Sequence, residues 1–196
     1  RKTLNLYPKQ TFIRGTDGFI RFTLQGNLLN SFYMIQTDKI PTIQGDLLDF
    51  PCGINRIAHS CNTHNVMGAG IAKQIKNRYP NAYESDCHAR YEDQNNLGNW
   101  SFAWTDATCQ RGIYNLYTQS KIGGERAVDY EGFYKSLSFV AEHLHYNYVN
   151  AEEDVILGLP YGISCGLAGG NWNVIYEMIN DVLANMPYQT LIVKYD

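Results

Sequence analysis

Two glycine-bearing stretches have the residue types and the spacing to bind a ligand. They read NTHNVMGAGIA at residues 62–72 and GISCGLAGGNW at residues 162–172, each between an apolar and an amphipathic run. Glycine loses more conformational freedom on folding than any other residue, so such clusters indicate a backbone that must approach another group closely. Loops that lead from a strand into a helix also carry unpaired N–H groups, which suits a diphosphate. Tight helix–strand packing is the alternative explanation for either loop.

The elements that would position these loops follow from the spacing of apolar residues. Alternation at residues 11–14, 19–25 and 31–36 is typical of two or three antiparallel strands. Further strands are predicted at 40–44, 56–61, 101–107, 112–117, 155–160 and 190–195, and helices at about 70–79, 130–146 and 173–184. This order predicts an α/β fold with a central, largely parallel or mixed sheet and helices on both faces.

Composition limits the classes of function. The 196 residues are 44% hydrophobic and 18% charged, which predicts one globular domain. A net charge of -3 makes nucleic acid an unexpected partner, but leaves a small phosphorylated ligand possible. Five cysteines without a CxxC pair fit neither a disulfide framework nor a zinc site, so we expect a reducing compartment, the cytoplasm. We find no apolar run long enough for a membrane span and no signal-peptide pattern.

Three segments, in order, resemble the signatures of the macro domain family. They are QGDLL at 44–48, AHSCN at 58–62 leading to MGAGIA at 67–72, and the stretch 162–172 after Leu159 and Pro160. The resemblance covers about Ile40 to Tyr195. It implies a three-layer α/β/α sandwich that binds ADP-ribose, with the two glycine loops around the diphosphate and the distal ribose. Residues 40–196 would form this macro domain, and residues 1–39 a β-hairpin-like extension packed on the same domain.

The resemblance also implies roles for single residues. Asp46 would accept a hydrogen bond from the adenine amine, although an aspartate after a strand can instead cap a turn. Asn62 would lie beside the distal ribose, or else be a turn residue. Tyr195 is a candidate for stacking on adenine. The other predicted ligand-binding residues are Leu47, Gly68, Ala69, Gly70, Ile71, Ser164, Cys165, Gly166, Leu167, Ala168 and Gly169.

Catalysis is predicted from the same resemblance, which is to the branch of ADP-ribose 1''-phosphate phosphatases and ADP-ribosyl hydrolases. In the phosphatases a histidine at the position of His59 acts near the terminal ribose phosphate, and histidine titrates near neutral pH. A lone histidine on a buried strand is otherwise a satisfied core residue. Asp129 is the predicted second acid–base group, with capping of the helix near Tyr130 as its alternative.

Two departures from the hydrolases narrow the prediction. Gln119 stands where hydrolases acting on carboxylates or DNA bases carry lysine, with Lys121 two residues away, and Ala168 stands where the protein-ester hydrolases carry aspartate. We therefore predict a phosphomonoesterase that converts ADP-ribose 1''-phosphate to ADP-ribose and phosphate, with no metal and no cofactor. The alternatives are a non-catalytic ADP-ribose reader, and an ADP-ribosyl glycohydrolase or binder of a related nucleotide signal. The oligomeric state is left open.

Overall fold

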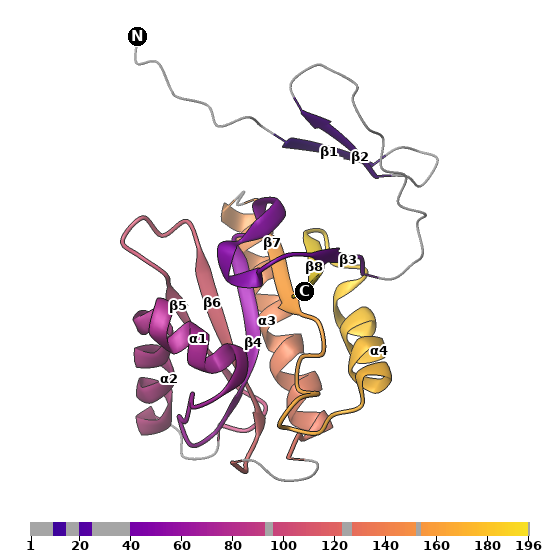
Figure 1. Ribbon diagram of the computed structural model, residues 1–196. Coiled ribbons are helices and arrows are strands. Elements are labelled where there is room, and N and C mark those ends of the chain that lie inside the picture. Colours follow the sequence, from indigo (N-terminus) through magenta and orange to yellow (C-terminus); the bar gives the residue numbers. More distant parts are fainter. Residues whose placement is uncertain are drawn as a thin grey trace. The chain divides into compact units, whose positions relative to one another are not determined.

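The computed structural model describes residues 10–14, 20–24, 40–92, 96–122, 127–151 and 154–195. The chain divides into two compact units, Arg1–Lys39 and Ile40–Asp196. In the first unit, β1 (Gln10–Arg14) and β2 (Ile20–Leu24) form an antiparallel pair, as predicted (Figure 1). The strand predicted at 31–36 lies outside the described residues. The packing of residues 1–39 on the domain stays a prediction.

The second unit is built on a six-stranded sheet with the order β3-β8-β7-β4-β6-β5. Its strands are β3 (Thr42–Gln44), β4 (Arg56–Asn62), β5 (Trp100–Trp104), β6 (Gly112–Gln119), β7 (Ile156–Pro160) and β8 (Gln189–Lys194). All neighbouring strands are parallel except β5, which runs antiparallel to β6. The predicted mixed sheet is confirmed.

Helices cover both faces of this sheet (Figure 1). They are α1 (Gly70–Arg78), α2 (Pro80–Glu92), α3 (Tyr130–Ala151) and α4 (Trp172–Leu183), with short 3-10 helices η1 (Leu47–Asp49) and η2 (Pro51–Gly53) after β3. The three-layer sandwich is thus confirmed. Helix α2 was not predicted, because the residues it buries fully, Ala82 and Asp86, give no apolar stripe.

Neighbouring residues of the central strands pack into separate layers, as the pleat of a strand requires. Ile57 and Ile113 join the layer under α1 and α2, where Ile75 is buried. Ala58 and Tyr114 join the layer under α3 and α4. Because β4 and β7 are parallel neighbours, their carboxyl ends lie at one edge of the sheet. The sheet therefore brings the two glycine-bearing loops together, although they are far apart in the sequence.

Candidate functional site

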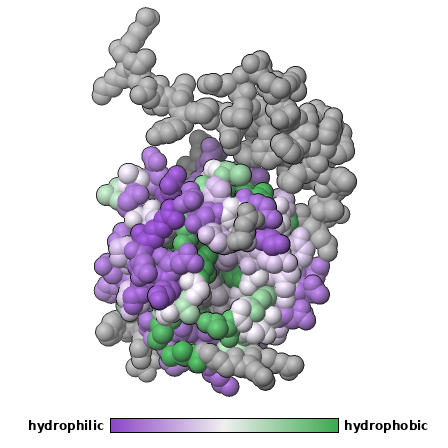
Figure 2. Space-filling model, viewed as in Figure 1, coloured by the Kyte–Doolittle hydropathy of each residue, from purple (hydrophilic) through white to green (hydrophobic). Residues whose placement is uncertain are grey.

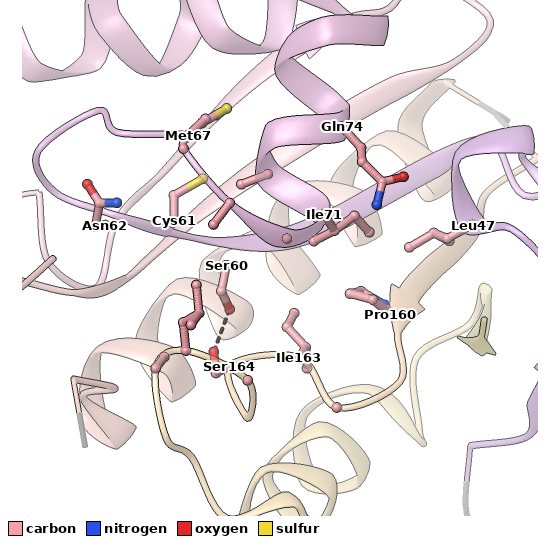
Figure 3. A pocket seen from close by; sticks show the side chains of 18 of the residues that line it. Leu47, Ser60, Cys61, Asn62, Met67, Ile71, Gln74, Pro160, Ile163 and Ser164 are labelled. Atoms are coloured by element: carbon pink, nitrogen blue, oxygen red, sulfur yellow. Dashed lines mark hydrogen bonds between the residues drawn. The ribbon is translucent and has the colours of Figure 1, made fainter. Parts of the chain in front are cut away.

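A pocket of about 620 Å³ lies where these loops meet. Most of its lining comes from the turn after β3, the end of β4 with the loop to α1, the end of β6, and the loop after β7 (Figure 3), and Asp86 on α2 with Val193 and Tyr195 at the end of β8 completes it. Hydrophobic side chains are exposed in a hollow of the face shown in Figure 2, with hydrophilic neighbours around them. The pocket has the size of a small-molecule or cofactor site and lies at the strand ends where ligands of α/β sheets bind.

Most of the residues predicted to bind a ligand line this pocket: Asp46, Leu47, Asn62, Gly68, Ala69, Gly70, Ile71, Ser164, Gly166, Leu167, Ala168 and Tyr195. Cys165 and Gly169 are not among the lining residues. The Cys165 thiol lies 3.3 Å from the carbonyl of Ile163, and the Gly169 N–H donates to the carbonyl of Gly166 at 3.0 Å. Both residues thus make contacts within the loop itself.

The remaining lining residues were not among the predicted ligand-binding residues, although Gln119 and members of the signature segments had been noted in the sequence. They are Gly45, Leu48, Ser60, Cys61, Val66, Met67, Ala72, Gln74, Asp86, Gln119, Ile122, Pro160, Tyr161, Gly162, Ile163 and Val193. Ser60 and Cys61 belong to a quoted segment, and the period-2 alternation of a strand could have shown that one of them faces the ligand. Asp86 carried no such signal, because it lies on the unpredicted helix α2. No lysine, arginine or histidine of the described residues lines the pocket.

The loop from β4 to α1 ends in an open helix N-terminus. Ala69 is the N-cap residue of α1 and has extended dihedral angles, φ -149° and ψ 169°, but no side-chain capping hydrogen bond. The first N–H groups of a helix have no partner within it. Here Gly70, Ile71 and Ala72, which supply them, line the pocket. The helix dipole adds partial positive charge at this end, so the arrangement suits an anion.

Two asparagine side chains hold this loop in shape. The Asn62 Oδ1 accepts hydrogen bonds from the N–H of His64 at 2.9 Å and of Val66 at 3.3 Å, and its Nδ2 donates to the Val66 carbonyl at 2.9 Å. Asn62 thus has the turn role left open by the sequence, while also lining the pocket. Asn65, with φ 59°, donates from Nδ2 to Asp86 Oδ1 at 2.9 Å. Burial raises the pKa of Asp86 to about 6, against a smaller lowering by this hydrogen bond.

The loop after β7 is held mainly by its own backbone. The Ser164 carbonyl accepts from the Gly170 N–H at 2.9 Å, and a Cβ at position 170 would lie 2.6 Å from that oxygen. Glycine is therefore required at this position. The N–H groups of Gly166, Leu167 and Ala168 donate to no backbone partner within the described part of the chain. These lining residues add turn N–H groups to the pocket wall opposite α1.

Asp46 and Tyr195, the residues predicted to contact adenine, also line the pocket. The Asp46 Oδ1 accepts from the Leu48 N–H at 2.9 Å and so caps η1, the capping role left open by the sequence. Its Oδ2 lies 3.8 Å from Arg78 Nη1, an ion pair too long to use all the acceptor capacity of this oxygen. Tyr195 is 74% exposed, so its ring is not covered by other side chains of the described residues and is accessible to a ligand.

Comparison with known proteins places this arrangement in a family. No protein-family model matches the chain. Over 146 residues, 70% of this chain and 86% of the relative, it is 30% identical to the uncharacterized 17.5 kDa protein in the tk-vs intergenic region of Enterobacteria phage T4. A segment of 52 residues is 49% identical to the ADP-ribose 1''-phosphate phosphatase of Aspergillus oryzae, which covers 25% of each protein.

Solved structures give the same result. A macrodomain protein from Streptomyces coelicolor is 27% identical with a TM-score of 0.55, over 73% of this chain and 88% of that one. The chain belongs to the macro domain family. Thermosipho africanus DarTG in complex with ADP-ribose has a TM-score of 0.64 at 19% identity, over 81% of this chain and 42% of that one. The latter likeness is one of fold.

His59 is a core residue in this macro domain. Its side chain is fully buried, its Nε2 lies 2.8 Å from Asn115 Oδ1, and it is not among the residues that line the pocket. Burial lowers the pKa of the imidazole to about 4, against a smaller raising by the Asn115 hydrogen bond, so the ring is neutral at pH 7. The geometry is that of a satisfied core histidine, not of a proton donor that faces a ligand.

Asp129 also lies outside the pocket lining. Its Oδ1 accepts from the Gly132 N–H at 2.7 Å, immediately before α3, which is the capping alternative. Gln119 does line the pocket, and its Nε2 donates to the Lys121 carbonyl at 3.1 Å. Lys121 itself is not a lining residue. Residues 123–126 of this segment lie outside the described part of the chain.

Among the described residues, no group of three or more His, Cys, Asp and Glu side chains could hold a metal ion. None of the helices in this part of the chain has the length and apolar character to span a membrane.

Proposed function

We propose that this macro domain binds ADP-ribose in the 620 Å³ pocket. The observation that carries the proposal is the uncapped N-terminus of α1, which opens into a pocket lined by no basic side chain of the described residues. A diphosphate placed there would be bound by neutral donors, namely the helix N–H groups and the turn N–H groups of Gly166 to Ala168. The adenine amine would donate to Asp46 at the other end. The bound state of Thermosipho africanus DarTG supports this ligand.

Binding can be tested by titration calorimetry with ADP-ribose. Asp46→Ala removes the acceptor expected to read adenine, and a hydrogen bond to a charged group corresponds to roughly 10- to 100-fold in affinity. Asp49→Ala is the matched control, because Asp49 also contacts Arg78 but does not line the pocket. Equal affinities of the two variants would remove Asp46 from the site, and a wild-type protein without affinity for ADP-ribose would overturn the proposal.

For the activity, we infer hydrolysis of ADP-ribose 1''-phosphate to ADP-ribose and phosphate. The 52-residue similarity to the Aspergillus oryzae phosphatase supports this reaction. Gln119 in the pocket, in place of the lysine of related hydrolases, weighs against lysine-based removal of ADP-ribose. A non-catalytic reader is the second candidate, and it is favoured by the positions of His59 and Asp129 outside the pocket lining.

Phosphate release from ADP-ribose 1''-phosphate, with and without EDTA, separates these two candidates. Release that EDTA does not change supports the phosphatase, whereas ADP-ribose binding without release supports the reader. If release occurs, His59→Gln should keep turnover within about tenfold, because a positioned general acid or base contributes roughly 10²- to 10⁴-fold and this imidazole does not face the pocket. A hundredfold loss of turnover with unchanged ADP-ribose affinity would return His59 to the chemistry.

A further inference from the structure

Three hydroxyl groups from separate parts of the chain meet at the pocket. The Ser60 Oγ, on β4, lies 2.5 Å from the Ser164 Oγ in the loop after β7, and Figure 3 shows this pair between the two segments. The Thr118 Oγ1, on β6, lies 3.4 Å from the same Ser164 oxygen. Ser60 and Ser164 line the pocket, whereas Thr118 is fully buried. The three hydroxyls form a short hydrogen-bonded series that runs from the buried Thr118 to the two serines at the pocket.

The number of hydroxyl protons shows that these three side chains can still donate one hydrogen bond to a ligand. Each hydroxyl has one proton to donate. Either oxygen of the Thr118–Ser164 contact could donate; we assign Thr118 as the donor, because it has no other side-chain partner within the described residues and a buried hydroxyl that donates to nothing is costly. The two serines then share one contact but have two protons. Whichever serine donates in that contact, one hydroxyl proton remains for an acceptor in the pocket.

The backbone of Ser164 is a second, independent sign of function. Its φ is 61°, in the left-handed region that residues with a Cβ rarely adopt. Such a conformation costs roughly 1–2 kcal/mol relative to the right-handed one, and glycine would relieve the cost. A serine at this position of a glycine-rich loop therefore keeps its side chain at the expense of stability. Strain of this kind is typical of residues that contact a ligand.

The lining of the pocket limits the donors that could bind an anion. No lysine, arginine or histidine of the described residues lines it, while two acidic residues, Asp46 and Asp86, do. An anionic ligand must then be bound by neutral donors alone. Ser60 lies on β4, which leads to the loop before α1, and Ser164 lies two residues before Gly166, so the pair belongs to the same two segments as the other neutral donors of the lining.

We propose that the Ser60–Ser164 pair, oriented by Thr118, donates a hydrogen bond to a phosphate oxygen of the bound diphosphate. The inference rests on the proposed binding of ADP-ribose in this pocket and adds the residues that read its diphosphate. Ser60 and Ser164 are then specificity residues, and Thr118 is a positioning residue.

The test compares ADP and ADP-ribose, which share the diphosphate but differ in the distal ribose. The double variant Ser60→Ala with Ser164→Ala removes both hydroxyls and keeps both Cβ atoms. We expect it to lose roughly 10- to 100-fold in affinity for both ligands, as for a hydrogen bond to a charged group. Either single variant should lose less, because the remaining serine keeps a free proton. Ser138→Ala is the control, since Ser138 lies on α3 outside the pocket lining and its hydroxyl donates to the Tyr134 carbonyl.

Each other outcome has a distinct meaning. A loss for ADP-ribose alone would place the pair on the distal ribose and overturn the proposal. Unchanged affinity for both ligands, or a wild-type protein that binds ADP-ribose but not ADP, would overturn it too. A wild-type protein that binds neither ligand would instead overturn the proposed function. A thermal melt of the double variant separates loss of a contact from loss of the fold.

Discussion

The two helices that follow the glycine-bearing loops begin in different ways. Helix α4 starts after Asn171, whose Oδ1 accepts from the Asn173 N–H at 3.0 Å and closes the helix end. Helix α1 starts after Ala69, which has no side-chain acceptor, and its first residues line the pocket. A similar sequence signal, glycines followed by an amphipathic helix, thus gives one closed end and one open end. Both ends carry the partial positive charge of a helix N-terminus, but only the first residues of α1 line the pocket and have no side-chain acceptor for their N–H groups.

The loops themselves are also held differently. Side-chain amides of Asn62 and Asn65 fix the first loop, whereas the second depends on a backbone contact between Ser164 and Gly170. The first loop should therefore be sensitive to removal of a polar side chain, and the second to addition of any side chain at its closest backbone contact. The variants below test this difference.

The largest effect is expected at Gly170. Gly170→Val would place a Cβ 2.6 Å from the Ser164 carbonyl oxygen, and backbone cannot give way as a side chain does. We expect a loss of about 3 kcal/mol in the free energy of unfolding, at the upper end for overpacking, together with loss of ADP-ribose binding. Gly166→Ala is the control, because a Cβ there meets nothing within 4 Å. Similar melting temperatures for the two variants would show that the second loop adapts.

The next effect is the dependence of the free energy of unfolding on pH. Two buried groups, Asp86 and His59, contribute to it with opposite signs. The pKa of Asp86 is raised to about 6, so its contribution to stability is full below about pH 4 and is lost as the pH rises through 6. The pKa of His59 is lowered to about 4, so its contribution is full above about pH 6.5 and is lost as the pH falls through 4. Between these limits the two contributions largely cancel.

Replacing one of these two residues should reveal the pH dependence of stability that the other one causes. With Asp86→Asn, which still offers an oxygen to Asn65, stability should rise by about 3 kcal/mol between pH 4 and 6.5. With His59→Gln it should fall by a similar amount between pH 4 and 6. Urea unfolding at four pH values measures both, and parallel slopes in the two variants would contradict the assignment. The backbone contact that holds the second loop contains no titrating group.

A smaller effect is expected for the amide that holds the first loop. Asn65→Ala removes the donor to Asp86 and puts alanine at φ 59°, which should cost about 2 kcal/mol. Asn65→Gly loses the same hydrogen bond but accepts that φ without strain. Chemical denaturation should therefore show alanine to be less stable than glycine by about 1 kcal/mol. Equal stability of the two would mean that the backbone at position 65 relaxes.

The smallest effect has opposite signs for folding and binding. Ala69→Ser would supply the missing N-cap of α1 and stabilise the fold by about 1 kcal/mol. The same hydroxyl would occupy an N–H group that the proposed diphosphate needs, and we expect roughly tenfold weaker ADP-ribose binding. Asn171→Ala, at the closed end of α4, should lower stability and leave affinity unchanged. If Ala69→Ser binds as well as the wild type, the open end of α1 is not the anion site.

Much of the fold could be read from the sequence because the signals are local. Short, mainly apolar runs in a repeated strand-then-helix order placed β4 and β6, and helical spacing placed α4, within a few residues of their observed bounds. Helix α2 was missed because it packs through Ala82 and Asp86, which local hydrophobicity does not distinguish from loop residues. The two loops were found from their glycines, and the order of the segments indicated the family.

The chemistry of the site depended on contacts between distant residues. His59 and Asp129 looked alike as candidates in the sequence, but Asn115 satisfies one in the core and the N–H of Gly132 the other. Asp86 meets Asn65 across 21 positions, and Ser60 meets Ser164 across 104. A polar side chain can bind a ligand only if other groups of the protein have not already used its hydrogen bonds. Those partners come from distant parts of the sequence, so they are fixed only when the sheet brings the strand ends together.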